Sequence, residues 1–186
     1  MTREPAMFHR LRRYVRRFAR DQRGTVAVVD FAILFPILLT MFLSGVEMGM
    51  MTVRQTLMEH ALDRAVRDLR IGTGEEVTHE SLRRRICGYA GLLPHCETSL
   101  KLEMRPTDMR TFSTKLGGAA DCINRAETVN PIRAFSNGQR SELMLLRACY
   151  VFNPIFPNIG FGFQAAKNEA GDIQLIATSA FVNEPT

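Results

Sequence analysis

Four cysteines carry most of the covalent chemistry open to this sequence, namely Cys87, Cys96, Cys122 and Cys149. All four follow the one long apolar stretch of the chain, so they share one compartment if that stretch crosses a membrane. An even number of cysteines in an exported domain predicts two disulfides. Loop-closure entropy favours pairs of sequence neighbours, Cys87 with Cys96 and Cys122 with Cys149. The alternative is a metal site of Cys87, His95 and Cys96, which lacks the C-x2-C spacing of a zinc knuckle.

The other histidines do not form a catalytic pattern. His60 lies in a predicted amphipathic helix, where a partly exposed surface histidine is the ordinary case. The sequence from His79 begins like the zinc-binding H-E-x-x-H motif, but Arg83 stands where the second histidine would be. The G-x-x-x-x-G-K-[ST] phosphate-binding motif and the G-x-S-x-G hydrolase motif are absent. We therefore expect a protein that is not an enzyme and binds no metal or cofactor.

The positive charge of the chain is concentrated at its N-terminus. The 186 residues carry a net charge of +5, with a mean hydropathy of -0.06 that excludes a membrane protein of many spans. Residues 1–23 hold eight arginines against Glu4 and Asp21, and the remainder of the chain is nearly neutral. Nucleic-acid binding usually needs a basic patch on the folded domain. The charge distribution therefore predicts no nucleic-acid partner.

Residues 25–53 form an apolar stretch whose only charged side chains are Asp30 and Glu47. Within it, residues 31–50 would span about 30 Å as a helix, which matches the hydrocarbon core of a bilayer. The sequence predicts one transmembrane helix over residues 25–53, preceded by a basic tail over residues 1–24. The arginines of the tail predict that it stays in the cytoplasm and that the C-terminal part is exported. A cleaved secretory signal is the alternative, but no A-x-A site closes the apolar run.

Periodicity after the apolar stretch predicts an α+β domain. Apolar residues recur at helical spacing over residues 54–71, so the membrane helix should continue on the exported side as an amphipathic helix. Within residues 72–186, Thr78 can cap a helix over residues 79–89. An antiparallel sheet of three to five strands should follow. Its predicted strands include residues 100–105, 143–152 and 173–182.

The start of the apolar stretch resembles a known family. The basic tail ends in Arg-Asp-Gln-Arg-Gly, residues 20–24, and after an acid and a Phe the helix reads Ala-Ile-Leu-Phe-Pro-Ile-Leu-Leu. Over residues 18–70 this resembles the TadE/TadG-like minor pseudopilins of tight-adherence (Flp) pilus systems. Residues 177–185 are also similar to the C-terminal strand of some members. The resemblance implies a pilin-like fold, in which a long N-terminal helix packs on a small antiparallel sheet.

The resemblance also implies roles for two residues of the helix. A prepilin peptidase would cut after Gly24 and leave Asp30 as the acid of the helix. The family's usual acid is Glu, five residues after the glycine, whereas Asp30 lies six residues after Gly24; a cut after Thr25 would restore the spacing. Asp30 would then offer a counter-charge to the amino group of a neighbouring subunit. The alternative is an interfacial carboxylate with no partner.

Three further features concern packing. Gly45 and Gly49 form a GxxxG spacing, which lets two helices approach closely. Glu47 is expected to be an ordinary acid near the outer membrane interface. A cluster of aromatic residues separated by Pro and Gly either closes a small core under a loop or docks a partner subunit. Its members are Tyr150, Phe152, Phe156, Phe161 and Phe163.

Together these features predict a minor pseudopilin-like protein of the bacterial inner membrane. Its N-terminus would be cytoplasmic and its C-terminal domain periplasmic. It would take part in assembly of a tight-adherence (Flp, type IVb) pilus or a related secretion apparatus through helix packing. The implied partners are other pilins and pseudopilins, inner-membrane pilus assembly proteins and the prepilin peptidase. The alternatives are a single-pass, signal-anchored periplasmic binding or sensory domain with no pilus role, and an exported enzyme held at the membrane.

Overall fold

The chain forms two compact units, Met1–Leu43 and Ser44–Thr186, and helix α2 (Arg23–Ile71) contributes residues to both. Most of the predicted basic tail and residues 72–76, between the two predicted helices, lie outside the described residues. The computed structural model describes residues 23–71, 77–110, 114, 118–132 and 134–183.

The described part of the first unit is the N-terminal part of α2. Every side chain from residue 27 to residue 42 is exposed, including large apolar ones such as Phe31, Leu38 and Phe42. The segment Ala27–Ile71 is long and apolar enough to cross a membrane. Apolar side chains on all sides of a helix gain free energy by leaving water. This part of α2 is therefore a candidate single-pass membrane anchor.

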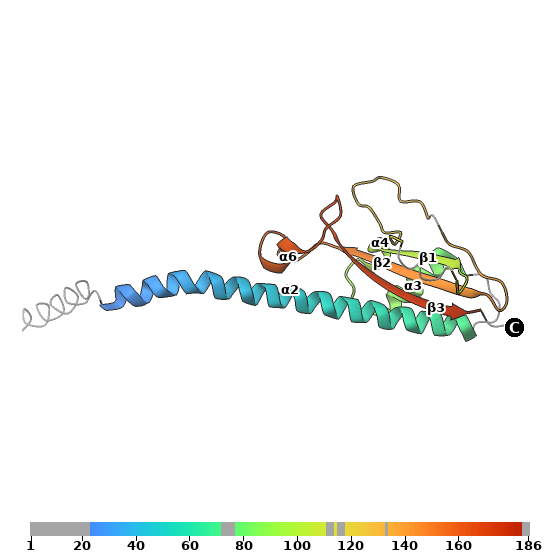
Figure 1. The fold of residues 1–186 in the computed structure, drawn as a ribbon, viewed down its shortest axis with the longest axis horizontal. Coiled ribbons are helices and arrows are strands. Elements are labelled where there is room, and N and C mark those ends of the chain that lie inside the picture. The colour runs from blue at the N-terminus through green and yellow to red at the C-terminus, as the bar shows by residue number, and fades with distance from the viewer. Residues whose placement is uncertain (1–22, 72–76, 111–113, 115–117, 133, 184–186) are drawn as a thin grey trace, which may run out of the picture. The chain divides into compact units, whose positions relative to one another are not determined.

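The second unit combines the C-terminal part of α2 with a three-stranded antiparallel sheet of order β1-β2-β3. Figure 1 shows the three strands side by side along this part of the helix. The fold is therefore α+β, as the sequence predicts. The strands are β1 (Leu100–Pro106), β2 (Leu143–Phe152) and β3 (Ile173–Val182), and the shorter helices are α3 (His79–Ala90), α4 (Cys96–Ser99) and α6 (Gly160–Gln164).

The core lies between α2, α3 and one face of the sheet. Buried residues recur every three or four positions along α2, as expected for the apolar stripe of an amphipathic helix. In β3 burial alternates residue by residue, because successive side chains of a strand point to opposite faces. The core residues of α2 are Met58, Ala61, Leu62, Ala65 and Val66.

The opposite face of the sheet is tied to the long segment between β1 and β2 by a disulfide and polar contacts. Cys122 of that segment is bonded to Cys149 of β2. Lys101 forms an ion pair with Asp121 at 2.9 Å, and Arg147 donates to the carbonyl oxygen of Gly118 at 2.8 Å. These contacts hold the segment against the sheet, where it has little regular secondary structure of its own.

Helix α3 is fastened to the domain at both ends. Thr78 caps it, with the backbone N–H of Ser81 donating to the Thr78 hydroxyl at 3.1 Å. The second disulfide joins Cys87 of α3 to Cys96 of α4, so the cysteines pair as loop-closure entropy favours. His79 is buried, and its Nε2 accepts a hydrogen bond from the backbone N–H of Leu102 at 3.1 Å. A histidine that accepts at Nε2 is neutral and carries its proton on Nδ1.

The burial of His79 makes the stability of the domain depend on pH. Burial, reinforced by the nearby charge of Arg83, lowers the pKa of His79 below its ordinary value of 6.5. The unfolded chain therefore binds a proton at a pH where the folded chain does not. We expect the free energy of unfolding to fall as the pH is lowered from about 7.5 to about 5.5, a range centred on the ordinary pKa of 6.5.

Denaturant titrations of the wild type and of His79→Gln across this pH range test the prediction. The glutamine amide oxygen can still accept the bond from Leu102 but does not titrate. The pH slope should be shallower in the variant. An unchanged slope would show that His79 is not its source.

Candidate functional site

The residues predicted to direct processing and assembly lie on α2. Gly24, the last residue of the predicted tail, lies in the first turn of the helix. Asp30 follows in the exposed apolar part, and its side chain is itself exposed. A carboxylate in this position can meet headgroup water or a cation of another subunit. Both interpretations of Asp30 stay predictions.

Gly45 and Gly49 lie one turn apart on a face of α2 that the second unit leaves uncovered. A Cβ atom at either glycine would have no atom within 4 Å beyond the adjacent helix backbone. Met48, beside them on the helix, is 57% exposed. This face is open to close approach by a second helix, and helix packing at the GxxxG spacing stays a prediction.

Glu47 lies on the opposite side of the helix, about 200° around the axis from each glycine. Its side chain is buried, with only 1% exposed. The backbone N–H of Ile155 donates to both of its carboxylate oxygens at 3.1 Å, and the N–H of Phe156 donates to Oε2 at 3.0 Å. The expectation that Glu47 is an ordinary interfacial acid is wrong, because a chain segment about 108 residues later covers it.

Ser44 makes a second attachment to the same segment, one helical turn before Glu47. The backbone N–H of Phe161, in the first turn of α6, donates to the Ser44 hydroxyl at 3.2 Å. Gly162 follows at a point where a Cβ atom would clash with the carbonyl oxygen of Phe156. Only glycine lets the loop fold back so closely on itself. We call residues 153–166 the Glu47 loop. The loop includes α6, and these contacts hold it against α2 (Figure 1).

The base of the Glu47 loop is held by Arg125. Its guanidinium donates to the Asn153 side chain and to the carboxylate of Asp172, both at 2.8 Å. It also donates to the Ser99 hydroxyl at 2.7 Å and to the carbonyl oxygen of Val151 at 3.2 Å. Asp172 is buried, so its pairing with a cation offsets the cost of removing it from water. Arg125 therefore joins the end of β2 to the beginning of β3 where the loop leaves the sheet.

Some members of the aromatic cluster belong to the core, and one is exposed. Tyr150 and Phe152 belong to the core, and the Tyr150 hydroxyl donates to the carbonyl oxygen of Pro94 at 2.8 Å. Phe156 and Phe161 are partly buried in the Glu47 loop. Phe163 is 67% exposed. The cluster thus closes part of the core, and its last member is presented at the surface of the loop.

One segment of the chain matches a known protein family. Residues 24–67 match the family model of the TadE-like proteins. The match confirms the resemblance seen in the sequence of the helix. No curated protein and no solved structure matches the chain. The TadE-like segment begins at the predicted processing site and includes Asp30, both glycines and Glu47, whereas the Glu47 loop lies outside it.

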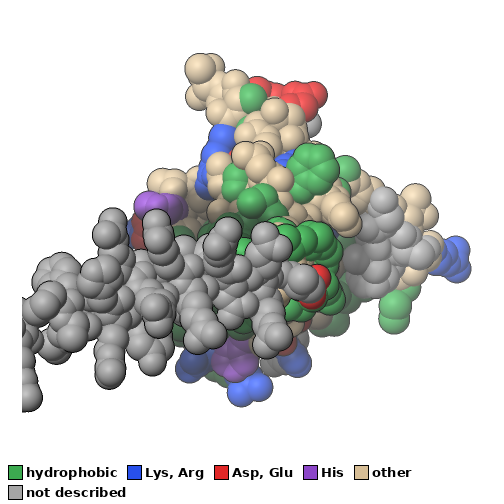
Figure 2. Space-filling view, turned by 90° about the vertical axis from the view of Figure 1, so that its left-hand side faces the viewer, with side chains coloured by type: hydrophobic (Ala, Val, Ile, Leu, Met, Phe, Trp, Pro, Cys, Tyr) green, Lys and Arg blue, Asp and Glu red, His purple; other side chains and the backbone are tan. Residues whose placement is uncertain are grey.

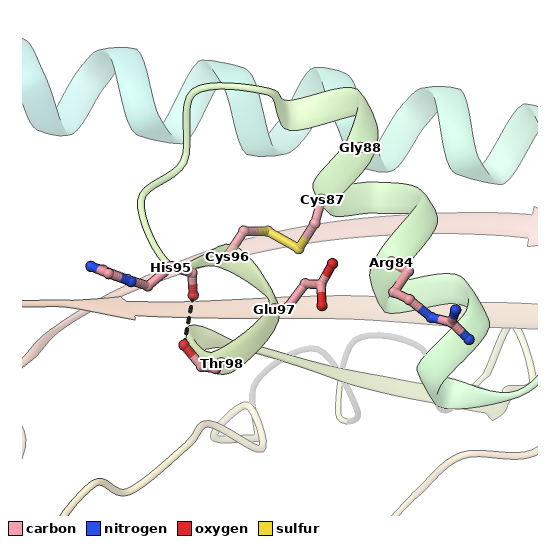
Figure 3. Close-up of a pocket in the computed structure, with 7 residues that line it drawn as sticks. All are labelled: Arg84, Cys87, Gly88, His95, Cys96, Glu97 and Thr98. Carbon is pink, nitrogen blue, oxygen red and sulfur yellow. Dashed lines mark hydrogen bonds between the residues drawn. A yellow bond between two sulfur atoms is a disulfide. The ribbon is translucent and has the colours of Figure 1, made fainter.

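Away from the TadE-like segment, a pocket of about 410 Å³ borders the Cys87–Cys96 disulfide. In Figure 3 the His95 ring points away from the disulfide, while Thr98 donates to the His95 carbonyl oxygen at 3.0 Å. Both sulfurs are bonded to each other, so neither can act as the thiolate ligand of the alternative metal site. Among the described residues, no group of three His, Cys, Asp or Glu side chains could hold a metal ion.

The contact between Glu47 and its loop is the feature that sequence reasoning missed. Two signals were present in the sequence. One is a second carboxylate within the apolar stretch, and the other is the absence of any charged residue from residue 153 to residue 166. Nothing in their spacing links the two, because they lie in distant parts of the chain.

Proposed function

We propose that this chain is a minor pseudopilin-like subunit that takes part in assembly of a tight-adherence pilus or a related secretion apparatus. The observation that carries the proposal is the TadE-like match, which covers the part of α2 whose apolar side chains are exposed on all sides. The name of that family associates it with the Tad pilus. Subunits of such a fibre or of its base would meet through this helix, and the uncovered face at Gly45 and Gly49 supports that mode of contact.

In this proposal α2 crosses the bacterial inner membrane once. The basic tail faces the cytoplasm, since arginines are retained on that side. The second unit then lies in the periplasm, where its two disulfides are stable. The chain acts by packing against other pilins, pseudopilins and inner-membrane assembly proteins, and it carries out no reaction itself.

Removal of the tail by a prepilin peptidase is the testable step. The intact mass of the full-length protein, extracted from membranes of a host with its own prepilin peptidase, should lack residues 1–24. A Gly24→Leu variant should keep the full mass, because the bulky side chain replaces the glycine before the cut.

The mass also distinguishes the alternatives. A loss of residues 1–25 would place the cut after Thr25 and would restore the usual spacing to Asp30. Full-length mass in both proteins would contradict the pseudopilin proposal and favour a signal-anchored periplasmic domain that keeps its tail.

A further inference from the structure

We propose that the Glu47 loop, residues 153–166, is a second membrane-contacting element, which enters the outer interface of the bilayer beside α2. Ile155, Ile159 and Phe163 would contact lipid, while Glu47 and Ser44 hold the loop in place. The proposal requires α2 to be anchored in the membrane, as in the proposed function, but it does not require the tail to be cleaved.

The attachment points set the depth of the loop. Ser44 and Glu47 fall within residues 31–50, the part of α2 that matches the thickness of the hydrocarbon core. Glu47 lies about 5 Å before the end of that stretch, at about 1.5 Å per residue. The loop contacts both side chains through hydrogen bonds of 3.0 to 3.2 Å. It must therefore lie at the same depth as this end of the helix.

The composition of the loop suits that depth. None of its 14 residues is charged. Ile155, Ile159 and Phe163 are 46%, 44% and 67% exposed. Exposed apolar side chains are common on soluble proteins, so their number alone would decide nothing. Their position beside the membrane-spanning stretch gives them lipid rather than water as a neighbour.

The hydrogen bonds answer the main objection to placing an irregular loop at a membrane. Non-helical backbone at membrane depth is tolerated only when protein groups satisfy its N–H and C=O groups. The N–H groups of Ile155, Phe156 and Phe161 are satisfied by the side chains of Glu47 and Ser44. This also accounts for the presence of an acid in the apolar stretch. Its carboxylate faces the loop and is shielded from lipid.

Two basic residues adjoin the loop. Arg54 lies about 10 Å beyond Glu47 along the helix, with its guanidinium 4.4 Å from the centre of the Phe152 ring. Lys167 directly follows the loop and donates to the carbonyl oxygen of Pro157 at 2.9 Å. The position of Arg54 along the helix is the level of the headgroups, where Lys and Arg are favourable. Figure 2, which looks along the long axis of Figure 1, shows both hydrophobic and basic side chains on the face turned to the viewer.

The chain contains no tryptophan, so a single Phe163→Trp substitution gives a specific probe of depth. The full-length variant is reconstituted in phosphatidylethanolamine–phosphatidylglycerol vesicles that contain lipids brominated near the glycerol end of the acyl chains. A Met109→Trp variant is the matched control. Met109 is 84% exposed and lies just beyond the far end of β1, about 20 Å along the strand from the end near the loop.

We expect bromine to quench the fluorescence of the Phe163→Trp variant about twofold or more relative to the Met109→Trp variant, because an interfacial element buries its apolar side chains about 5–10 Å into the boundary between headgroups and acyl chains. Adding Glu47→Leu to the Phe163→Trp variant should reduce this quenching toward the control value. Equal quenching of the two single variants would overturn the proposal. The proposal would also be overturned if neither lipid bromine nor aqueous iodide quenched the tryptophan at position 163. That result would indicate a protein partner on the loop.

A third probe separates failure of this inference from failure of membrane anchoring. Phe42 is 68% exposed on α2, within the stretch predicted to span the membrane. If bromine quenches a Phe42→Trp variant but not the Phe163→Trp variant, α2 is anchored and the loop proposal alone is wrong. If neither is quenched, the anchoring of α2 is wrong and the loop proposal falls with it.

Discussion

Replacement of Glu47 by leucine is expected to lower the free energy of unfolding by about 2 to 3 kcal/mol. Leucine approximates the size of the side chain but accepts no hydrogen bond. The N–H groups of Ile155 and Phe156 would then lose their acceptor in a part-buried setting. Glu47→Gln keeps one acceptor oxygen without the charge, so its effect should be smaller, about 1 kcal/mol.

Denaturant unfolding of the detergent-solubilised full-length protein, followed by circular dichroism, measures these changes. Glu59→Leu is the matched control. Glu59 lies on the same helix but is exposed, and a surface substitution usually changes stability by less than about 0.5 kcal/mol. If Glu47→Leu and Glu59→Leu unfold alike, the contacts between Glu47 and the loop do not stabilise the domain.

Loss of the Cys122–Cys149 disulfide is expected to have the other large effect. The closed loop spans 27 residues, against 9 for Cys87–Cys96. Chain entropy then predicts a cost of about 3.5 kcal/mol for replacing Cys122 and Cys149 with alanine, and about 2.5 kcal/mol for replacing the other pair. Cys149 is also buried in β2, so its removal takes away packing as well.

The two double variants serve as controls for each other, since each removes one disulfide and two sulfur atoms. Both are compared with the wild type in the same denaturant titration without reductant. A larger loss for the Cys87 and Cys96 variant would show that loop length does not govern the contribution of these disulfides.

Much of the fold follows from local sequence signals. The predicted strands over residues 143–152 and 173–182 have the bounds of β2 and β3, because apolar runs and alternation reflect burial on one or both faces. Thr78 caps α3 as expected, since a cap depends on neighbouring residues alone. The sequence allows three to five strands, because the segment between β1 and β2 has no periodic pattern.

The sequence by itself determined the long apolar helix, the TadE-like segment that it carries and the α+β character of the domain. Each of these depends on residues close together in the chain. Only the tertiary structure decided that Glu47 and Ser44 hold a loop and that Gly45 and Gly49 remain uncovered on the other side of the helix. The physical reason is that the partners of Glu47 are backbone N–H groups. Every residue except proline has such a group, so no side-chain pattern marks the two that the fold brings to the carboxylate.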